Sequence, residues 1–209
     1  FGCTSMANAE CIKRVADIVS SDDAVSCVVV SAPGKRAKND TKVTDLLYAC
    51  LDKVNDGLSP QEAFKPIEER FDSILKGLNL NCDFKTYYDE IKSELAKGAT
   101  KDYIASRGEF LSAVVLSEYL NWKFIDAKDF VRFDDKGNFL SEETNAYAKA
   151  VLHGVKRAII PGFYGATGDG TIKTFSRGGS DISGSIVARA LYADIYENWT
   201  DVDGFMKCD

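Results

Sequence analysis

The stretch that decides the fold is VSCVVVSA at residues 25–32, a continuous run of β-branched and small apolar residues. It lies between an aspartate-rich segment and a Pro-Gly segment, both typical of turns. An apolar run without polar alternation is typical of a strand that is buried on both faces. We therefore expect a strand here, in a sheet that helices cover on both sides.

The segments next to this strand have helical periodicity. Residues 8–19 and 45–54 each repeat apolar side chains at helical spacing, and a basic loop at 33–42 leads into the second of them. The Glu- and Lys-rich stretch 59–102 predicts two more amphipathic helices, with stop signals at Gly77 and Gly98.

The second half of the chain alternates between the two patterns. The stretch 107–120 predicts a helix with Glu109 in its first turn. Further helices are expected at 144–155 and 181–193, and strands at 123–127, 157–167, 171–176 and 194–202. This alternation predicts an α/β fold with a mainly parallel sheet, in which ligands bind beyond the carboxyl ends of the strands.

Composition narrows the class of protein. The 209 residues carry a net charge of −6, which argues against a general nucleic-acid surface. The six cysteines lack the spacing of zinc or redox motifs, so we expect reduced thiols and a cytoplasmic protein. The longest apolar stretch is too short to span a bilayer, so no membrane association is expected.

The loop RGGSD at 177–181 lies between a predicted strand and a predicted helix. Gly178 and Gly179 allow close approach of a ligand, and Ser180 or Asp181 can cap the helix. A helix N-terminus favours an anion, and Arg177 adds a planar group suited to a carboxylate or phosphate. From this loop alone, an ordinary capped turn with Arg177 in solvent explains the residues equally well.

The first residues, FGCTS, have a similar composition of glycine and small hydroxyl side chains before a helix. Thr4, Ser5 and the surrounding N–H groups could hold a phosphate, although the Gly-Lys-Ser/Thr of a P-loop is missing. Taken alone, a capped turn is the simpler interpretation.

Four other residues offer polar groups near element ends. Thr44 stands at a helix start with a hydroxyl for a ligand, and Glu109 offers a carboxylate for an ammonium group. Thr200 and Asp201 offer groups for the sugar or base of a nucleotide, although a closed turn also explains the second pair.

Taken in order, five segments resemble the aspartokinase branch of the amino acid kinase family. They are FGCTSMANAE, VVVSAPGK with KVTDLL, SRGEFLSA, PGFYGATGDGTIKTFSRGGSD and WTDVDGFMKCD, and they cover nearly the whole chain. The resemblance implies a three-layer α/β/α sandwich of the carbamate kinase-like type, with an eight-stranded central sheet. It also implies ATP-dependent phosphorylation of the side-chain carboxylate of L-aspartate, the first step toward lysine, threonine and methionine.

The same resemblance assigns roles to residues. Substrate residues fall on Thr44, Glu109, Phe163, Arg177 and Ser180. Nucleotide and phosphate residues fall on Gly2, Cys3, Thr4, Ser5, Gly178, Gly179, Thr200, Asp201 and Met206. Gly2 and Asp181 are the catalytic candidates, with Asp181 orienting cationic groups, and the cofactor is ATP with Mg²⁺ and no dedicated protein metal site.

The chain departs from the family pattern at Cys3, which replaces a glycine, and at Met206, where an aromatic residue is common. A positive φ at Cys3 would cost roughly 1–2 kcal/mol. We expect one catalytic domain over 1–209 that is incomplete at both ends and lacks regulatory ACT domains. The chain by itself is then expected to have little or no activity, and the full-length protein to form a homodimer.

Two alternatives remain. The chain could act on another acceptor, as a glutamate, acetylglutamate, carbamate or nucleotide kinase does. It could also be a non-catalytic subunit that senses an amino acid or a nucleotide. A dinucleotide oxidoreductase is disfavoured, because no GxGxxG follows the first predicted strand.

Overall fold

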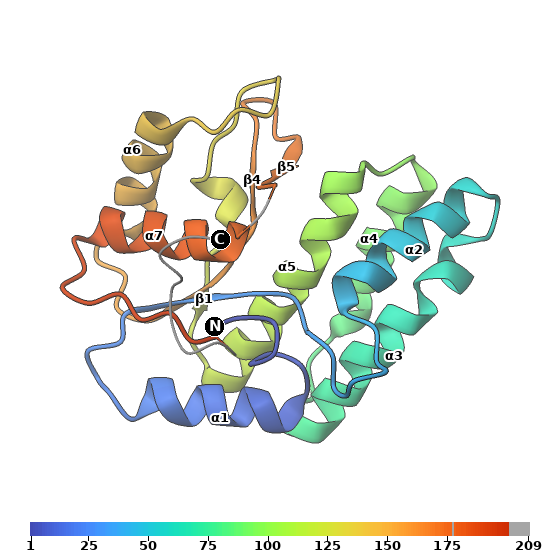
Figure 1. The fold of residues 1–209 in the computed structure, drawn as a ribbon, viewed down its shortest axis with the longest axis horizontal. Coiled ribbons are helices and arrows are strands. Elements are labelled where there is room, and N and C mark those ends of the chain that lie inside the picture. The colour runs from blue at the N-terminus through green and yellow to red at the C-terminus, as the bar shows by residue number, and fades with distance from the viewer. Residues whose placement is uncertain (177, 201–209) are drawn as a thin grey trace.

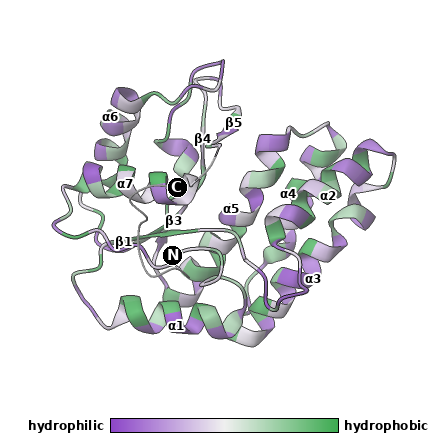
Figure 2. Cartoon of the chain, in the orientation of Figure 1, coloured by the Kyte–Doolittle hydropathy of each residue, from purple (hydrophilic) through white to green (hydrophobic). Residues whose placement is uncertain are grey.

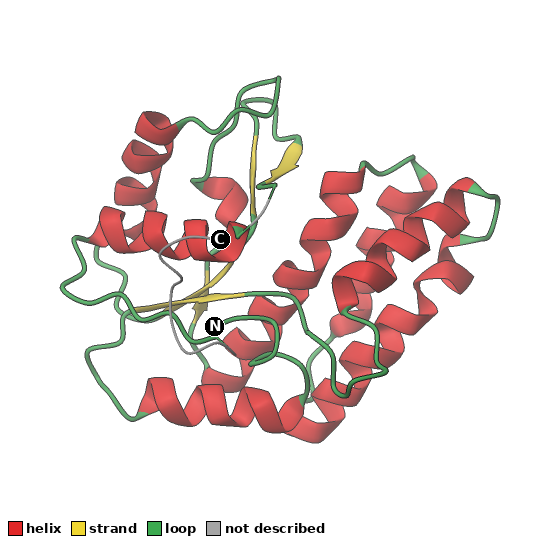
Figure 3. Ribbon diagram, in the orientation of Figure 1, coloured by secondary structure: helices red, strands yellow, loops and turns green. Residues whose placement is uncertain are grey.

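The computed structural model describes residues 1–176 and 178–200. Helices dominate it, and the strands are short (Figure 3). The elements in chain order are α1 (Ala9–Ser20), β1 (Cys27–Val30), α2 (Val43–Asn55), α3 (Pro60–Leu78), α4 (Phe84–Ala96), α5 (Lys101–Leu120), β2 (Lys123–Phe124), the 3-10 helix η1 (Ala127–Asp129), α6 (Ser141–Leu152), β3 (Ala158–Pro161), β4 (Tyr164–Ala166), β5 (Ile172–Thr174) and α7 (Gly179–Leu191).

A parallel sheet of order β1-β3-β2 lies at the centre of the molecule (Figure 1). Val28 pairs with Ile159 and Val30 with Pro161, so the carboxyl ends of β1 and β3 lie together. β4 and β5 form a separate antiparallel pair. The expected α/β class and parallel sheet are confirmed, while the described residues form five strands rather than the eight that the resemblance implied.

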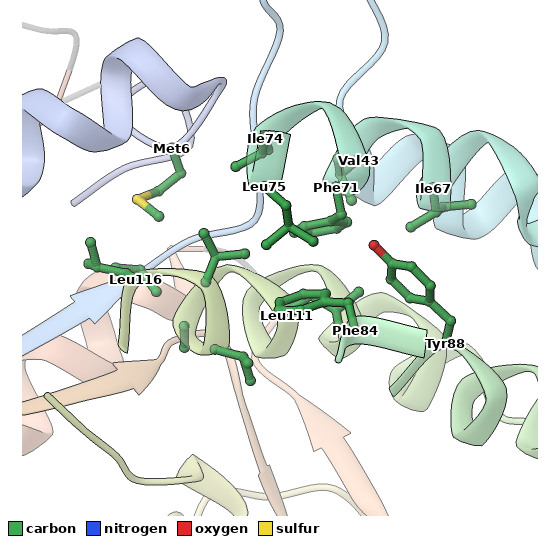
Figure 4. Close-up of a cluster of buried hydrophobic side chains, with 14 of the residues drawn as sticks. Met6, Val43, Ile67, Phe71, Ile74, Leu75, Phe84, Tyr88, Leu111 and Leu116 are labelled. Carbon is green, nitrogen blue, oxygen red and sulfur yellow. The ribbon is translucent and has the colours of Figure 1, made fainter. Parts of the chain in front are cut away.

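The sheet separates two hydrophobic cores, as a strand buried on both faces requires. Val28, Val30 and Ile159 point into a core built with α1 to α5, part of which Figure 4 shows around Phe71 and Leu111. Alternate strand residues point into the other core, which α6, α7, β4 and β5 complete. Hydrophobic and hydrophilic residues alternate along the outer helices (Figure 2), whereas α5 is buried on nearly all sides over residues 104–117.

Two segments without regular secondary structure lie beside the β1 edge of the sheet. The backbone N of Phe1 donates to the carbonyl of Val29 at 2.8 Å, and the N–H of Ser31 donates back to the Phe1 carbonyl at 3.2 Å. The Gly2 N–H in turn donates to the carbonyl of Trp199 at 2.9 Å, and the Phe1 and Trp199 rings stack 5.7 Å apart. Both ends of the described chain therefore reach the same edge of the sheet.

Three expectations about local structure were wrong. α5 begins at Lys101, so Glu109 lies in the middle of this helix rather than in its first turn. α3 runs through Gly77 to Leu78 and ends at Asn79, which takes the left-handed conformation that closes the helix. Residues 194–200 have no regular secondary structure, although a strand was expected over 194–202.

Gly77 does not end the helix but allows two helices to pack closely. A Cβ placed there would lie 2.5 Å from the Cβ of Ala9, at the contact between α3 and α1. In 1–176 and 178–200, no helix is long and apolar enough to cross a membrane.

We expect Gly77→Ala to destabilise the protein by about 1–2 kcal/mol, because forcing two helices apart costs more than the gain in helix propensity. Denaturant unfolding at equilibrium measures this difference. In the Gly77→Ala/Ala9→Gly double variant the crowding atom is removed, so most of the lost stability should return. Equal destabilisation in the single and double variants would show that this contact is not the cause.

Candidate functional site

Two glycine-bearing turns that are distant in sequence line one pocket of about 270 Å³. The first is residues 2–5 and the second is residues 178–181, which form the start of α7. Ser31, Phe163, Asn198 and Thr200 complete the lining. The structure thus brings these two turns together, and the pocket lies beyond the carboxyl ends of β1 and β3.

Three glycines let the walls of the pocket approach one another. A Cβ at Gly34 would lie 2.7 Å from the Cys3 carbonyl oxygen, and one at Gly162 would lie 2.8 Å from the Ser180 Cα. A Cβ at Gly179 would lie 2.6 Å from the Phe163 ring. Real Cβ atoms do not come this close, so the spacing of the walls depends on these three residues being glycine.

The N-terminus of α7 opens on the pocket. Gly178 has φ of +59° and ends the incoming loop, and the first intrahelical bond runs from the Ile182 N–H to its carbonyl. The first N–H groups of a helix have no acceptor within the helix, and together with the helix dipole they favour an anion. This end of the pocket is therefore suited to a carboxylate or a phosphate.

The start of α7 is fixed to the end of β3 by Ser183. Its hydroxyl donates to the Gly179 carbonyl at 2.8 Å and accepts from the Phe163 N–H at 3.0 Å. Phe163 has φ of +77°, a region that costs a non-glycine residue roughly 1–3 kcal/mol. Backbone strain is frequent at ligand sites. Here the strained Phe163 is held by a part-buried hydrogen bond, and its ring lies against Gly179.

Residues 31–34, which we call the hub segment, connect the two glycine-bearing turns of the site. The Ser31 hydroxyl donates to the Ser180 hydroxyl at 2.8 Å, and the Gly34 N–H donates to the Cys3 carbonyl at 2.7 Å. The Ala32 N–H faces the carboxyl group of Glu109 and lowers its pKa, and a Cβ at Gly108 would lie 2.7 Å from the Cβ of Ala32, so the hub segment also reaches α5. The continuous run VVVSA therefore leads directly into the residues that assemble the pocket.

A buried arginine fixes the loop that follows the hub segment. Arg70 of α3 is 3% exposed, and its guanidinium bonds the Gly34 carbonyl at 2.8 Å, the Thr41 carbonyl at 3.0 Å and the Asp40 carboxylate at 2.6 Å. Arg36 binds the same carboxylate through two nitrogens. The hydrogen bonds from Arg36, and then those from Arg70, hold the pKa of Asp40 well below its usual range.

Glu109 is buried behind the hub segment and is 6% exposed. Its Oε2 is solvent-inaccessible and has no hydrogen-bond partner among the described residues. Burial raises the pKa of Glu109 to about 8, against the opposing effect of the Ala32 N–H. A carboxyl group with one unsatisfied oxygen is suited to receive a cationic group of a ligand.

Most of the residues expected at the site come together. Those that line the pocket are Gly2, Cys3, Thr4, Ser5, Phe163, Gly178, Gly179, Ser180, Asp181 and Thr200. Thr44 and Glu109 are not part of this lining; they belong to α2 and α5, whose neighbours Val43 and Gly108 meet beside Ala32. Arg177, Asp201 and Met206 lie outside the described residues.

Two details differ from the expected phosphate loop. Cys3 is not among the residues with positive φ, so its replacement of a glycine carries no such strain. The Gly2 N–H is used by the Trp199 carbonyl, so it is not aimed at a ligand in this conformation.

Sequence reasoning missed Ser31 and Asn198, both of which line the pocket. Asn198 donates from Nδ2 to the Asp181 carboxylate at 3.2 Å. Ser31 directly follows the apolar run of β1, and this position at a strand's carboxyl end was a usable signal. Asn198 had no comparable signal, because its segment was expected to form a strand.

Across 1–176 and 178–200, no three metal-binding side chains gather into a group that could hold a metal ion. Asp181 is the carboxylate in the described lining of the pocket. Mg²⁺ commonly keeps several waters and binds through one or two carboxylates and substrate phosphates. The donor set therefore fits a cation that arrives with a polyphosphate.

Comparison with known proteins agrees with this geometry. The model of the amino acid kinase family matches residues 1–209. Aspartokinase 3 of Bacillus subtilis is 37% identical over 97% of this chain and 48% of its own length, and chloroplastic aspartokinase 1 of Arabidopsis thaliana is 32% identical over 100% and 40%. The chain thus spans half or less of the length of these relatives.

Solved structures are similar as well. Clostridium acetobutylicum aspartate kinase matches with a TM-score of 0.93 and 44% identity, over 100% of this chain and 48% of that chain. Escherichia coli aspartokinase III in complex with aspartate and ADP matches with a TM-score of 0.80 and 28% identity, over 98% and 48%.

We expect Arg70→Ala to destabilise the protein by about 2–4 kcal/mol, since it leaves buried carbonyls without their donor. The matched control is Arg36→Ala, which removes an exposed partner of the same carboxylate and should cost under about 1 kcal/mol. Denaturant unfolding of both variants tests this. Equal losses would mean that Arg70 does not anchor the loop.

The raised pKa of Glu109 makes stability depend on pH. The unfolded state ionises this group near its ordinary 4.5 while the folded state keeps the proton to about 8. Stability from this group is therefore full below about 4.5 and is lost as pH rises to about 8. Glu109→Gln should gain stability relative to the parent across that range, by on the order of 2–4 kcal/mol at pH 9. A difference between the two proteins that does not vary with pH would contradict this.

Proposed function

Because the chain belongs to the amino acid kinase family, we propose that it forms the substrate-binding part of an aspartokinase. The reaction is transfer of the γ-phosphoryl group of ATP to the side-chain carboxylate of L-aspartate, which gives 4-phospho-L-aspartate. The observation that carries the proposal is the pocket in which residues 2–5 and the N-terminus of α7 face each other. The aspartokinase relatives, one of them with aspartate and ADP bound, support the choice of substrates.

Aspartate would be recognised by groups of opposite charge. The N-terminal N–H groups of α7, with the hydroxyl of Ser180, favour a carboxylate of the substrate. Glu109 would take the ammonium group, with Thr44 beside it on α2, and Arg177 would add a second contact to a carboxylate. A plain dicarboxylate has no group for Glu109, so this arrangement selects an amino acid.

Phosphoryl transfer asks the protein mainly for placement and for stabilisation of charge. The turn at residues 3–5 would lie along the phosphates, and Thr200 and Asp201 along the nucleoside. Mg²⁺ bound to the phosphates supplies positive charge for the migrating group. Asp181, held by Asn198, would orient cationic groups and metal-bound waters; a carboxylate nucleophile has no proton for it to remove.

Binding of aspartate is linked to the proton on Glu109. This carboxyl group holds its proton up to about pH 8, and pairing with an ammonium group requires that the proton leave. The affinity for aspartate should therefore rise with pH between about 6 and 8, by at most about tenfold per pH unit.

The wider setting is also a proposal. The protein would act in the cytoplasm, in agreement with its free cysteines at positions 3, 11, 27, 50 and 82, and at the start of lysine, threonine and methionine synthesis. A longer chain would carry the remaining nucleotide residues, regulatory ACT domains and a homodimer interface. The 209 residues alone would then have little or no turnover.

The test is a panel of acceptors assayed for ADP release, using the longer polypeptide that contains this chain with ATP and Mg²⁺. L-aspartate should be the preferred acceptor over L-glutamate, N-acetylglutamate, carbamate and succinate. Glu109→Gln should raise the KM for aspartate at least about tenfold and remove its pH dependence, since the ionisable partner is gone. Turnover with another acceptor would assign a different amino acid kinase, and binding without turnover would indicate a sensor.

A further inference from the structure

We propose that Ser31 is a positioning residue that orients the hydroxyl of Ser180 toward the amino acid substrate. This inference rests on the proposed function and adds a residue to which the family resemblance assigns no role. Ser31 is the first residue after β1, it lines the pocket, and its hydroxyl donates to the Ser180 hydroxyl at 2.8 Å.

The two hydroxyl oxygens are 2.8 Å apart, and either hydroxyl can donate, because each has one proton and two lone pairs. When Ser180 gives its proton to a substrate, it can still accept from Ser31, so the contact between the two residues is kept. Ser180 lines the pocket, so a carboxylate oxygen of a bound substrate is in a position to receive this proton. Without Ser31, the same hydroxyl could rotate among its three staggered positions.

The backbone of Ser180 cannot compensate for a lost partner. Gly162 lies directly behind it, since a Cβ there would come within 2.8 Å of both Cα and Oγ of Ser180. The first turn of α7 is also held by the bonds of Ser183 to Gly179 and Phe163. Rotation of the side chain is the remaining freedom, and the bond from Ser31 removes it.

Ser31 also connects two groups that recognise opposite charges. Ser31 contacts Ser180, and the N–H of the next residue, Ala32, faces the carboxyl group of Glu109. The groups near the two charged ends of an amino acid are therefore held by neighbouring residues of the hub segment. A change at Ser31 should therefore affect the amino acid and leave the nucleotide unaffected.

The experiment is steady-state kinetics of Ser31→Ala in the longer polypeptide, with the KM for aspartate, the KM for ATP and kcat measured separately. Loss of one orienting hydrogen bond corresponds to roughly a tenfold rise in the KM for aspartate. We expect kcat within about threefold of the parent and an unchanged KM for ATP. Ser31→Thr, which keeps the hydroxyl, should recover most of the affinity.

A double-variant cycle separates positioning from general structure. If Ser31 acts only through Ser180, then Ser31→Ala/Ser180→Ala should resemble Ser180→Ala alone. The matched control is Ser117→Ala, which removes a buried serine hydroxyl that bonds the Val114 carbonyl in α5 and should leave both KM values unchanged. Thermal unfolding shows whether each variant is folded.

The outcomes are distinct. An unchanged KM for aspartate in Ser31→Ala, equal changes in both KM values, or additive effects in the double variant would overturn the inference while the parent enzyme still phosphorylates aspartate. Absence of aspartate turnover in the parent would instead refute the proposed function, and the assignment of Ser31 with it.

Discussion

The site depends on four consecutive residues, the hub segment 31–34, which leave the end of β1 and contact both glycine-bearing turns of the pocket. Ser31 bonds Ser180, the Ala32 N–H faces the carboxyl group of Glu109, and Gly34 bonds Cys3. Two of these contacts, those of Ala32 and Gly34, are made by the backbone, and Gly34 has no room for a side chain. The geometry of the site is therefore set by the path of the main chain at the end of one strand, and the side chains that face the ligand are attached to that path.

The fold explains why this path is reproducible. One face of β1 is buried and the other is half-buried against a second core, so a shift in register would expose apolar surface. Arg70 anchors the loop beyond the hub segment from α3, and Ser183 anchors the start of α7 to the end of β3. Arg70 and Ser183, which come from helices on opposite faces of the sheet, thus both hold segments at the carboxyl ends of the strands. Ligands bind at this edge in α/β folds of this class.

Sequence patterns predicted the parts of the molecule that follow from periodicity. The buried run at 25–32 and the helical spacing at 8–19 and 45–54 correspond to β1, α1 and α2. Glycines were less reliable as predictors of helix ends. Gly77 does not end α3, and it is glycine because Ala9 packs against it. Residues 194–200 have strand-like composition, yet Tyr196 packs on Gly184, a contact that local sequence does not encode. For the site, loop composition identified both turns of the pocket, whereas the burial of Glu109 and the contact from Ser31 to Ser180 arise only from tertiary packing.

Because the walls come from residues near positions 2, 31, 163, 180 and 198, nearly the whole span of the chain lies between one wall and another. No local piece of the polypeptide can hold the ligand on its own, so occupancy requires the cooperative native state. A small molecule in this crevice would shift the global unfolding equilibrium and slow amide exchange in helices that it never touches. Only fully folded molecules can therefore bind the ligand.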